Sequence, residues 1–273
     1  MAAELAGSIR DTARALEPDR YIAAVLAPRP ARDDLIALAA FAAELTRIPR
    51  QVHDPMAAEI RIQWWRDAIP AGIDGTKSGN PIADAFANTV RRHALPLSAI
   101  DDLLDAHAHR LYAAPPADDA ALSLELELTD GTLFAFAAKI LGADDTEKNR
   151  ALISNATQAY GRARLGVGLP YALRGGRTPF PSGLVTAAEE AQQNWRPAIA
   201  HLCRNARAHL ANVKPHFSQA SPALRAALLP VALVEPYLKA LEGAVTDPAR
   251  DLVEIVPLTR LWRLSFASWR GRV

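Results

Sequence analysis

The sequence predicts an all-α protein, and three observations indicate that class. Half of the residues are hydrophobic but only 6% are aromatic, and alanine and leucine, which favour helices, fill most apolar positions. Apolar residues recur at helical spacing, and proline or glycine interrupts the pattern where helices should end. No segment shows the apolar-polar alternation of a half-buried strand. We therefore expect one helical domain over residues 1–273.

The expected helices follow from these interruptions. The first two cover residues 19–27 and 32–48, and proline follows each of them. The third begins at Asp54, whose side chain can cap it, and runs to residue 69. Further helices are expected over 81–93, 97–112, 118–141 and 146–169, and then near 186–217, 221–243 and 257–270. The glycine-rich pieces near residues 166 and 175 follow no expected strand, so they do not match phosphate-binding loops.

Charge and cysteine content restrict the partners and the compartment. The formal net charge is +1, so no overall field attracts nucleic acid, and we expect no nucleic-acid partner. Cys203 is the single cysteine, which leaves no internal disulfide and favours a reducing compartment. The N-terminal residues lack the apolar core of a signal peptide, and no uncharged stretch reaches the roughly 18 residues of a membrane span. We expect a cytoplasmic protein, with a peripheral position at the inner membrane as the alternative.

Two stretches could take part in ligand binding or catalysis: one is rich in aspartate and the other in glycine. The run of Asp101, Asp102 and Asp105 has DDxxD spacing, with which isoprenoid synthases hold magnesium, an ion that prefers oxygen ligands. It also fits an ordinary helix start, where negative charge interacts well with the helix dipole, and we favour that interpretation. The glycines of the 146–169 helix, Gly161 and Gly166 among them, indicate close approach of another helix or of a ligand.

The segment 257–270 mixes aromatic residues and arginines. Trp262, Phe266 and Trp269 alternate with Arg263 and Arg270. This composition is typical of a helix lying on a membrane surface. It also fits a terminal packing helix whose arginines extend their charged ends into water. Both interpretations stay open, and the first makes the C-terminal Trp/Arg helix a candidate for peripheral membrane contact.

Several blocks resemble the squalene/phytoene synthase family when they are taken in order. These blocks are residues 19–45 ("DRYIAAVLAPRPARDDLIALAAFAAEL"), 59–69 ("EIRIQWWRDAI"), 103–112, 129–142, 159–170 ("AYGRARLGVGLP"), 175–181 ("GGRTPFP") and 260–264 ("RLWRL"). The resemblance spans nearly the whole chain. It implies an isoprenoid-synthase-type bundle of helices around a central apolar cavity, with two Asp-rich motifs that hold magnesium against prenyl diphosphates.

The chain departs from this family where the metal motifs should stand. Residues 46–50 ("TRIPR") and 164–173 ("RLGVGLPYAL") contain no carboxylate. A family aspartate is replaced by Arg110, and a family tyrosine by Glu125. The pattern resembles the branch without Asp-rich motifs that includes mitochondrial complex I assembly factors, and we expect a pseudoenzyme rather than a functional prenyltransferase.

The resemblance leads to expectations about ligands and partners. We expect no catalytic residues, metal or cofactor, and a prenyl or acyl lipid or a respiratory-chain subunit as partner. Arginines replace acids at two family positions, so candidate residues for binding an anionic head group are Arg47, Arg61, Arg110, Arg162 and Tyr171. The alternative is an active transferase that condenses isoprenyl diphosphates with magnesium held by Asp101, Asp102, Asp105 and Glu44, with Glu125 on a facing helix.

Overall fold

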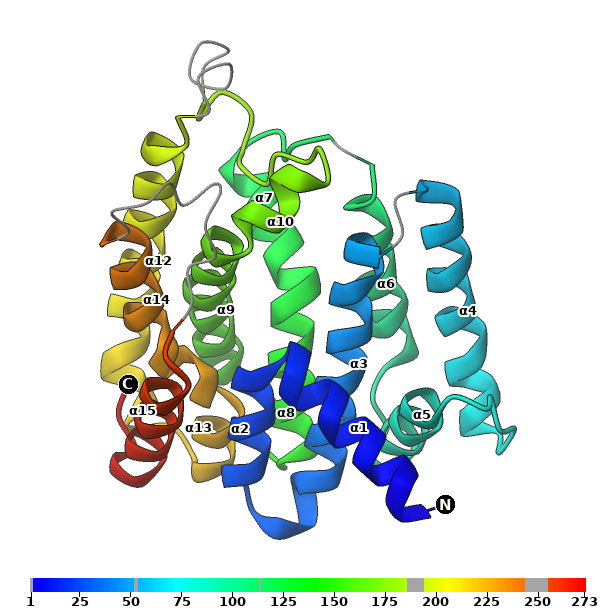
Figure 1. Ribbon diagram of the computed structural model, residues 1–273. Helices are drawn as coiled ribbons and strands as arrows, with labels where there is room; N and C mark the ends of the chain where they lie inside the picture. Colours follow the sequence, from blue (N-terminus) through cyan, green and yellow to red (C-terminus); the bar gives the residue numbers. More distant parts are fainter. Residues whose placement is uncertain (1, 52–53, 113, 186–193, 244–254) are drawn as a thin grey trace. The chain divides into compact units, whose positions relative to one another are not determined.

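The computed structural model describes residues 2–51, 54–112, 114–185, 194–243 and 255–273 (Figure 1). All regular structure in these residues is helical, with no strand among them, which confirms the predicted all-α class. The chain divides into two compact units. The first comprises Met1–Tyr112, Thr132–Asp145 and Ser221–Ala227, and the second comprises Ala113–Gly131, Thr146–Ala220 and Leu228–Val273. That these units form one domain stays a prediction.

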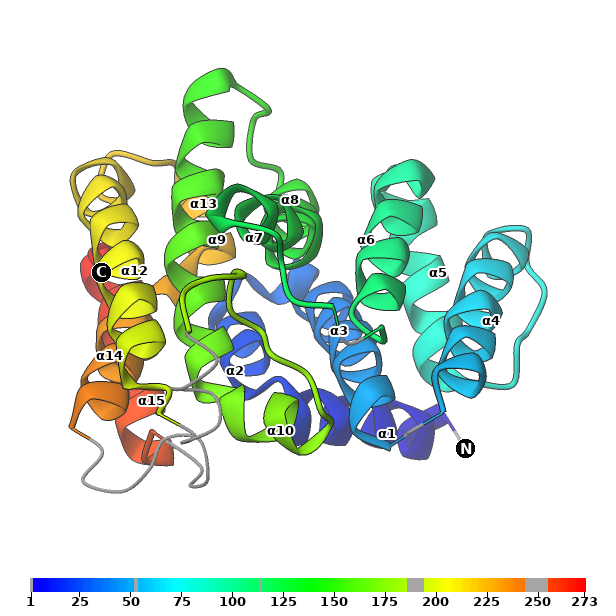
Figure 2. The same cartoon turned by 90° about the horizontal axis from the view of Figure 1, so that it is seen from above.

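The first unit is built around the alanine-rich helix α3. Its elements are α1 (Ala2–Leu16), α2 (Pro18–Leu26), η1 (Arg29–Ala31), α3 (Arg32–Gln51), α4 (Pro55–Ile73), α5 (Pro81–His93), α6 (Leu97–His109), α8 (Thr132–Ile140) and α13 (Pro222–Ala227). Figures 1 and 2 show α3, α4, α5 and α6 side by side, and all four helices contact one another or a shared neighbour. Asp54 caps α4 as predicted, because its carboxylate accepts the Met56 N–H at 3.1 Å.

Aromatic side chains join α3, α4 and α5 in the core of the first unit. The ring of Phe41 stacks on Phe86 with centroids 4.0 Å apart. The edge of Trp65 packs against Phe41 with centroids 5.2 Å apart. All three side chains are buried, so this cluster holds the three helices together through apolar burial and aromatic contacts. Trp65 thus anchors α4 in the core of the unit.

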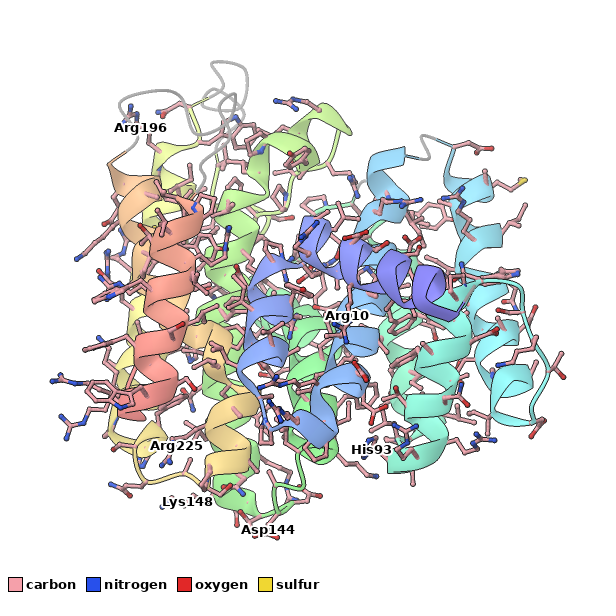
Figure 3. All side chains as sticks on the ribbon, turned by 60° about the horizontal axis from the view of Figure 1, so that its bottom comes forward. Arg10, His93, Asp144, Lys148, Arg196 and Arg225 are labelled. Atoms are coloured by element: carbon pink, nitrogen blue, oxygen red, sulfur yellow. The ribbon has the colours of Figure 1, made fainter. Side chains whose placement is uncertain are left out.

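A buried carboxylate also ties α3 to the end of α5. Asp34 accepts hydrogen bonds from Arg92 at 2.8 Å and from the Thr89 hydroxyl at 3.1 Å, and its Oδ2 lies 2.8 Å from Nε2 of His93. Figure 3 marks His93 on this helix end. Burial by itself would raise the pKa of Asp34, but the bonds from His93, Arg92 and Thr89 lower that pKa below its ordinary value. Asp34 is therefore held as an anion inside the unit.

The second unit is organised around α9. It contains α7 (Asp119–Leu126), η2 (Glu127–Gly131, a π-helical turn), α9 (Glu147–Val167), α10 (Leu169–Arg174), α12 (Arg196–Phe217), η3 (Leu229–Leu233), α14 (Val234–Glu242) and α15 (Pro257–Arg270). Helix α9 begins at its N-cap Thr146, whose hydroxyl accepts the Asn149 N–H at 3.2 Å. Both α12 and α14 pack along α9, as Figure 1 shows, and α7 and η2 contact it as well.

Two glycines of α9 are sites of close helix approach. A Cβ added at Gly161 would lie 2.7 Å from Cδ2 of Leu126 on α7. A Cβ at Gly166 would lie 2.7 Å from Cδ1 of Leu241 on α14. Real Cβ atoms do not come this near to another side chain, so the missing side chains let α7 and α14 pack directly on the α9 backbone. The predicted close approach by another helix is confirmed at both positions.

The helix boundaries differ from the sequence prediction at several places. Helix α1 was not expected at all. The helix expected over 118–141 is divided into α7, the π-helical turn η2 and α8, and the one expected over 221–243 is divided into α13, η3 and α14. The start of the helix expected near 186 lies outside the described residues, and α12 begins at Arg196. No described helix is both long and apolar enough to cross a bilayer.

Candidate functional site

The DDxxD run lies on α6 in the first unit. Asp101, Asp102 and Asp105 are all exposed. Arg66 of α4 forms ion pairs with two of them: its Nε is 3.8 Å from Asp101, and its Nη2 hydrogen-bonds to Asp105. In this geometry the aspartates pair with an arginine of the neighbouring helix. The described residues contain no group of three or more His, Cys, Asp or Glu side chains placed to hold a metal ion.

The other predicted residues of the first unit lie on different helices. Glu44 and Arg47 form an ion pair of 3.1 Å along α3, Arg61 is exposed on α4, and Arg110 is half-buried at the end of α6. Tyr171 belongs to α10 of the second unit and lies under the guanidinium of Arg174, 5.6 Å from the ring centroid. A basic mouth that combines Arg47, Arg61, Arg110, Arg162 and Tyr171 stays a prediction.

The resemblance places the family's metal motifs at residues 46–50 and 164–173, and the described side chains there do not fit magnesium. In residues 46–50, the Thr46 hydroxyl donates to the Ala42 carbonyl at 2.9 Å, and Arg47 is a cation paired with Glu44. In residues 164–173, Arg164 lies 3.8 Å from Asp130, and the segment has no carboxylate of its own. Magnesium needs several oxygen ligands in octahedral geometry, and neither segment supplies them.

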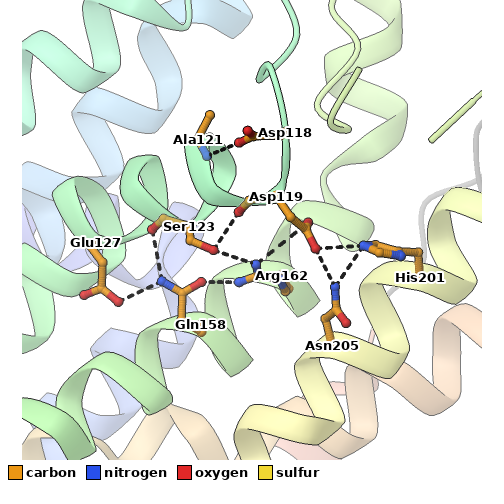
Figure 4. Close-up of polar contacts among 9 residues, drawn as sticks. All are labelled: Asp118, Asp119, Ala121, Ser123, Glu127, Gln158, Arg162, His201 and Asn205. Atoms are coloured by element: carbon orange, nitrogen blue, oxygen red, sulfur yellow. Dashed lines mark hydrogen bonds and ion pairs between the residues drawn. The ribbon is translucent and has the colours of Figure 1, made fainter. Parts of the chain in front are cut away.

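The polar centre of the second unit is a group of side chains around Arg162 (Figure 4). We call it the Arg162 cluster, and it consists of Asp119, Ser123, Glu127, Gln158, Arg162, His201 and Asn205. Helix α7 and η2 supply the first three, α9 supplies Gln158 and Arg162, and α12 supplies His201 and Asn205. Gln158 and Arg162 are one helical turn apart, as are His201 and Asn205, so each pair projects from one face of its helix. The cluster thus joins four elements through polar contacts.

Arg162 is 2% exposed and Gln158 is 4% exposed. The guanidinium donates from Nη1 to the Gln158 amide oxygen and from Nη2 to the Ser123 hydroxyl at 2.9 Å. The Gln158 amide nitrogen in turn donates to the Ser123 carbonyl at 3.0 Å and to Glu127 Oε1 at 2.7 Å. Ser154 donates to the same Glu127 oxygen at 2.7 Å. These bonds fix the amide of Gln158 with its oxygen toward the cation.

Asp119 connects the buried arginine with α12. Its Oδ1 is 4.0 Å from Arg162 Nη2. Its Oδ2 is 2.9 Å from His201 Nε2 and accepts from the Asn205 amide at 2.9 Å. The His201 tautomer with its proton on Nε2 donates to this carboxylate, which is a stronger acceptor than a neutral nitrogen. Asp119 therefore receives two side-chain donors on one oxygen and faces the Arg162 cation with the other.

Burial changes the pKa values of the basic groups here. It lowers the pKa of Arg162 from its ordinary value, while the negative charges of Asp119 and Glu127 oppose that change. His209 on α12 lies 3.2 Å from Asn155 through Nδ1. Burial and then the Arg162 cation lower the pKa of His209 below 6.5, and Asp119 opposes them. His209 is accordingly neutral at pH 7 in the folded protein.

The contacts of Ser123 exclude a hydrolytic triad in this cluster. Its hydroxyl donates to the Asp119 backbone carbonyl at 2.7 Å and accepts from Arg162. The hydroxyl proton is thus directed to a peptide oxygen, whereas an activated serine needs a base as its acceptor. Two atoms, Arg162 Nε and Asp119 Oδ1, are buried without a hydrogen-bond partner. The cluster holds a cation and connects α7, η2, α9 and α12.

Sequence reasoning found one member of the cluster and missed the others. Arg162 was a candidate for ligand binding, but Asp119, Ser123, Gln158, His201 and Asn205 were not. The spacing of four residues in the pairs 158–162 and 201–205 was a usable signal of shared helix faces. Nothing in the sequence indicates that α7 packs against those two faces.

The sequence was compared with protein-family models and with curated proteins. Residues 13–265 match the family model described as squalene/phytoene synthase. The complex I assembly factor 6 of Bos taurus is 25% identical over 266 residues, which cover 92% of this chain and 78% of that protein. The Rattus norvegicus protein of the same name is 22% identical over 267 residues, covering 93% of this chain and 79% of that protein.

Solved structures share the fold at low identity. The squalene synthase HpnC from Alicyclobacillus acidocaldarius superposes with a TM-score of 0.73 at 17% identity, covering 88% of this chain and 94% of that one. A dehydrosqualene synthase in complex with a ligand gives a TM-score of 0.72 at 11% identity, covering 97% and 96%. The isoprenoid-synthase-type helical fold predicted from the sequence is confirmed.

Proposed function

We propose, because the chain belongs to the squalene/phytoene synthase family, that it is a non-catalytic member which supports the assembly of respiratory complex I. Support for the assembly role comes from the mammalian relatives, which carry that function in their names and match more than nine-tenths of this chain.

The chemistry of residues 46–50 and 164–173 carries the non-catalytic part of the proposal. Ionisation of an allylic diphosphate needs divalent cations to neutralise the departing charge, and those cations need carboxylates. These segments contain no carboxylate. Two of their three arginines, Arg47 and Arg164, are instead paired with Glu44 and Asp130. The positive charge of an arginine side chain repels a divalent cation.

The proposal includes a lipid ligand held without metal. An anionic head group on a prenyl or acyl chain suits arginine, whose planar fork pairs with phosphate in two places. We assign head-group contact in the first unit to Arg47, Arg61 and Arg110, and Tyr171 of the second unit stays a separate candidate; none of the four is buried. Arg162 is buried and takes a positioning role. Mass spectrometry of lipid extracted from the purified protein tests this part; protein without lipid that also ignores added prenyl diphosphate contradicts it.

A prenyl-transfer assay tests the non-catalytic part. The purified chain is incubated with magnesium and farnesyl or geranylgeranyl diphosphate, with the squalene synthase HpnC as the active control. We expect no head-to-head product above the rate without protein. A product would overturn this part and would favour the alternative, in which Asp101, Asp102, Asp105 and Glu44 hold magnesium.

Deletion of the coding sequence in its host tests the assembly role. We expect the amount of assembled complex I, measured on native gels and by NADH oxidation in membranes, to fall while succinate oxidation stays unchanged. Re-expression of the intact chain should restore complex I. Unchanged complex I in the deletion strain would contradict the proposal.

A further inference from the structure

Helix α15 presents a broad apolar face to solvent. Leu258 is 75% exposed, Trp262 is 58% exposed and Trp269 is 80% exposed. Leu261 and Phe266 are exposed as well. Since α-helical residues advance by 100° each, these five side chains fall on one side of the helix. We call them the α15 apolar face.

The opposite side attaches α15 to the second unit. Leu264 and Ala267 are buried, and α15 contacts η3. Arg260 lies near the same side and donates to the Tyr237 hydroxyl at 3.4 Å. The helix is therefore docked through a narrow edge of small and aliphatic side chains, while its large aromatic side chains point away from the unit.

The aromatic residues of this face form a continuous row that arginines border. Trp262 and Phe266 are stacked with centroids 5.1 Å apart, and Phe266 and Trp269 are 6.2 Å apart. The guanidinium of Arg263 lies 5.7 Å from the Trp262 ring centroid, and that of Arg270 lies 4.9 Å from the Phe266 centroid. These two arginines are seven residues apart, so they lie on the same edge of the face.

The charge of the segment selects the type of partner. Residues 255–273 contain four arginines and no acidic residue. The exposed apolar side chains of α4, Met56 and Ile60, lack this purely basic surrounding, because an acidic residue, Glu59, and a basic one, Arg61, flank Ile60. A second copy of α15 fits poorly on the first, because residues 255–273 contain no acidic side chain to pair with its arginines. An anionic lipid surface offers phosphates to the arginines and an interfacial layer in which tryptophan is favoured.

We propose that α15 lies flat in the interface of an anionic lipid bilayer, with the α15 apolar face between the head groups and with Arg263, Arg270 and Arg272 on lipid phosphates. The unit then sits on the membrane through this helix. The proposal is independent of the complex I role, since it concerns only where the chain binds and not what it assembles.

Flotation with lipid vesicles tests the proposal on the full chain. We expect the protein to float with vesicles of equal parts phosphatidylcholine and phosphatidylglycerol, and to stay behind with phosphatidylcholine alone or in high salt. Lipids brominated on their acyl chains should quench its tryptophan fluorescence. Failure to bind the anionic vesicles would overturn the proposal. So would a stable dimer in which the α15 apolar face is covered.

Variants separate the two parts of the interaction. The double variant Arg263→Gln/Arg270→Gln should bind the anionic vesicles about 30-fold more weakly, which corresponds to ~2 kcal/mol for two charges. Trp262→Ala/Trp269→Ala should abolish the quenching by brominated lipids. Ile60→Ala on α4 is the matched control and should bind like the parent. Circular dichroism should be the same for all variants, because every altered side chain is exposed. Equal binding by the parent and both double variants would overturn the proposal.

Discussion

Replacement of Arg162 by methionine tests whether the Arg162 cluster stabilises the second unit. Methionine keeps an unbranched apolar stem but removes the guanidinium. Gln158 and Ser123 then lose the cation to which they are bonded, and Asp119 loses the charge that lies 4.0 Å away. The variant therefore removes two charge-assisted hydrogen bonds and one long ion pair.

The expected loss of stability follows from these contacts. Two hydrogen bonds to a charged group contribute about 1.5–3 kcal/mol each. Removing the buried cation relieves its desolvation, which offsets roughly half of that gain. The ion pair adds little, because its two atoms are 4.0 Å apart and the Asp119 side chain is 42% exposed. We expect the unfolding free energy to fall by about 2–3 kcal/mol.

Urea unfolding followed by circular dichroism measures this change. Arg204→Met on α12 is the matched control, since Arg204 is exposed and its loss should alter stability by less than about 0.5 kcal/mol. Equal unfolding free energies for the two variants would refute the stabilising role of the cluster.

The same variant has a second consequence at His209. Burial and the Arg162 cation lower the pKa of His209 below 6.5. Because the unfolded chain binds this proton more readily, the neutral His209 contributes stability that is present above pH 6.5 and is lost as the pH falls toward the folded pKa. In Arg162→Met the pKa of His209, measured by NMR titration, should rise. An unchanged pKa would show that Arg162 does not act on this ring.

Three further changes test other parts of the molecule. Gly161→Ala should lower the unfolding free energy by about 1–3 kcal/mol, because its Cβ would meet Leu126 at 2.7 Å; a more stable variant would contradict that contact. Cys203 should react slowly with iodoacetamide in the folded protein and quickly in urea, since burial raises the pKa of its thiol to about 11; equal rates would be inconsistent with that burial. Asp34→Asn should destabilise the protein at pH 7 by about 2–3 kcal/mol, and the difference should shrink as the pH falls below 3.8, where the low pKa of Asp34 no longer adds stability; a difference independent of pH would contradict this.

The helical class and several helix starts could be predicted because they depend on local chemistry. Asp54 and Thr146 cap their helices through bonds to residues two or three positions later. The division of the expected 118–141 helix depends on more distant contacts. The Thr129 hydroxyl bonds to the Glu125 carbonyl at 2.8 Å, and Gly131 lies against Thr157, which a Cβ would approach to 3.3 Å. A π-helical turn stabilised by another helix leaves no periodic signal in its own sequence.

The candidate site could be predicted only in part for the same reason. Arg162 was among the residues expected to bind an anionic head group, an expectation that came from the family resemblance. Its partner Ser123 is 39 residues away, and Asp119 and His201 are separated by 82 residues. Their meeting depends on how α7 and α12 pack on α9. Conversely, the DDxxD spacing of α6 was visible in the sequence, but only the fold reveals that Arg66 pairs with Asp101 and Asp105.

The glycines and the arginine of α9 depend on one another. Gly161 lets Leu126 of α7 pack against the α9 backbone, and Arg162, the next residue, is bonded to Ser123 on the same helix α7. A larger side chain at position 161 would move α7 away, and water would then reach the guanidinium and weaken its bonds. Burial of the guanidinium also lowers the pKa of Arg162. Arg162 of α9 is bonded to Ser123 of α7, so the buried cation and the glycine beside it together hold α7 against α9.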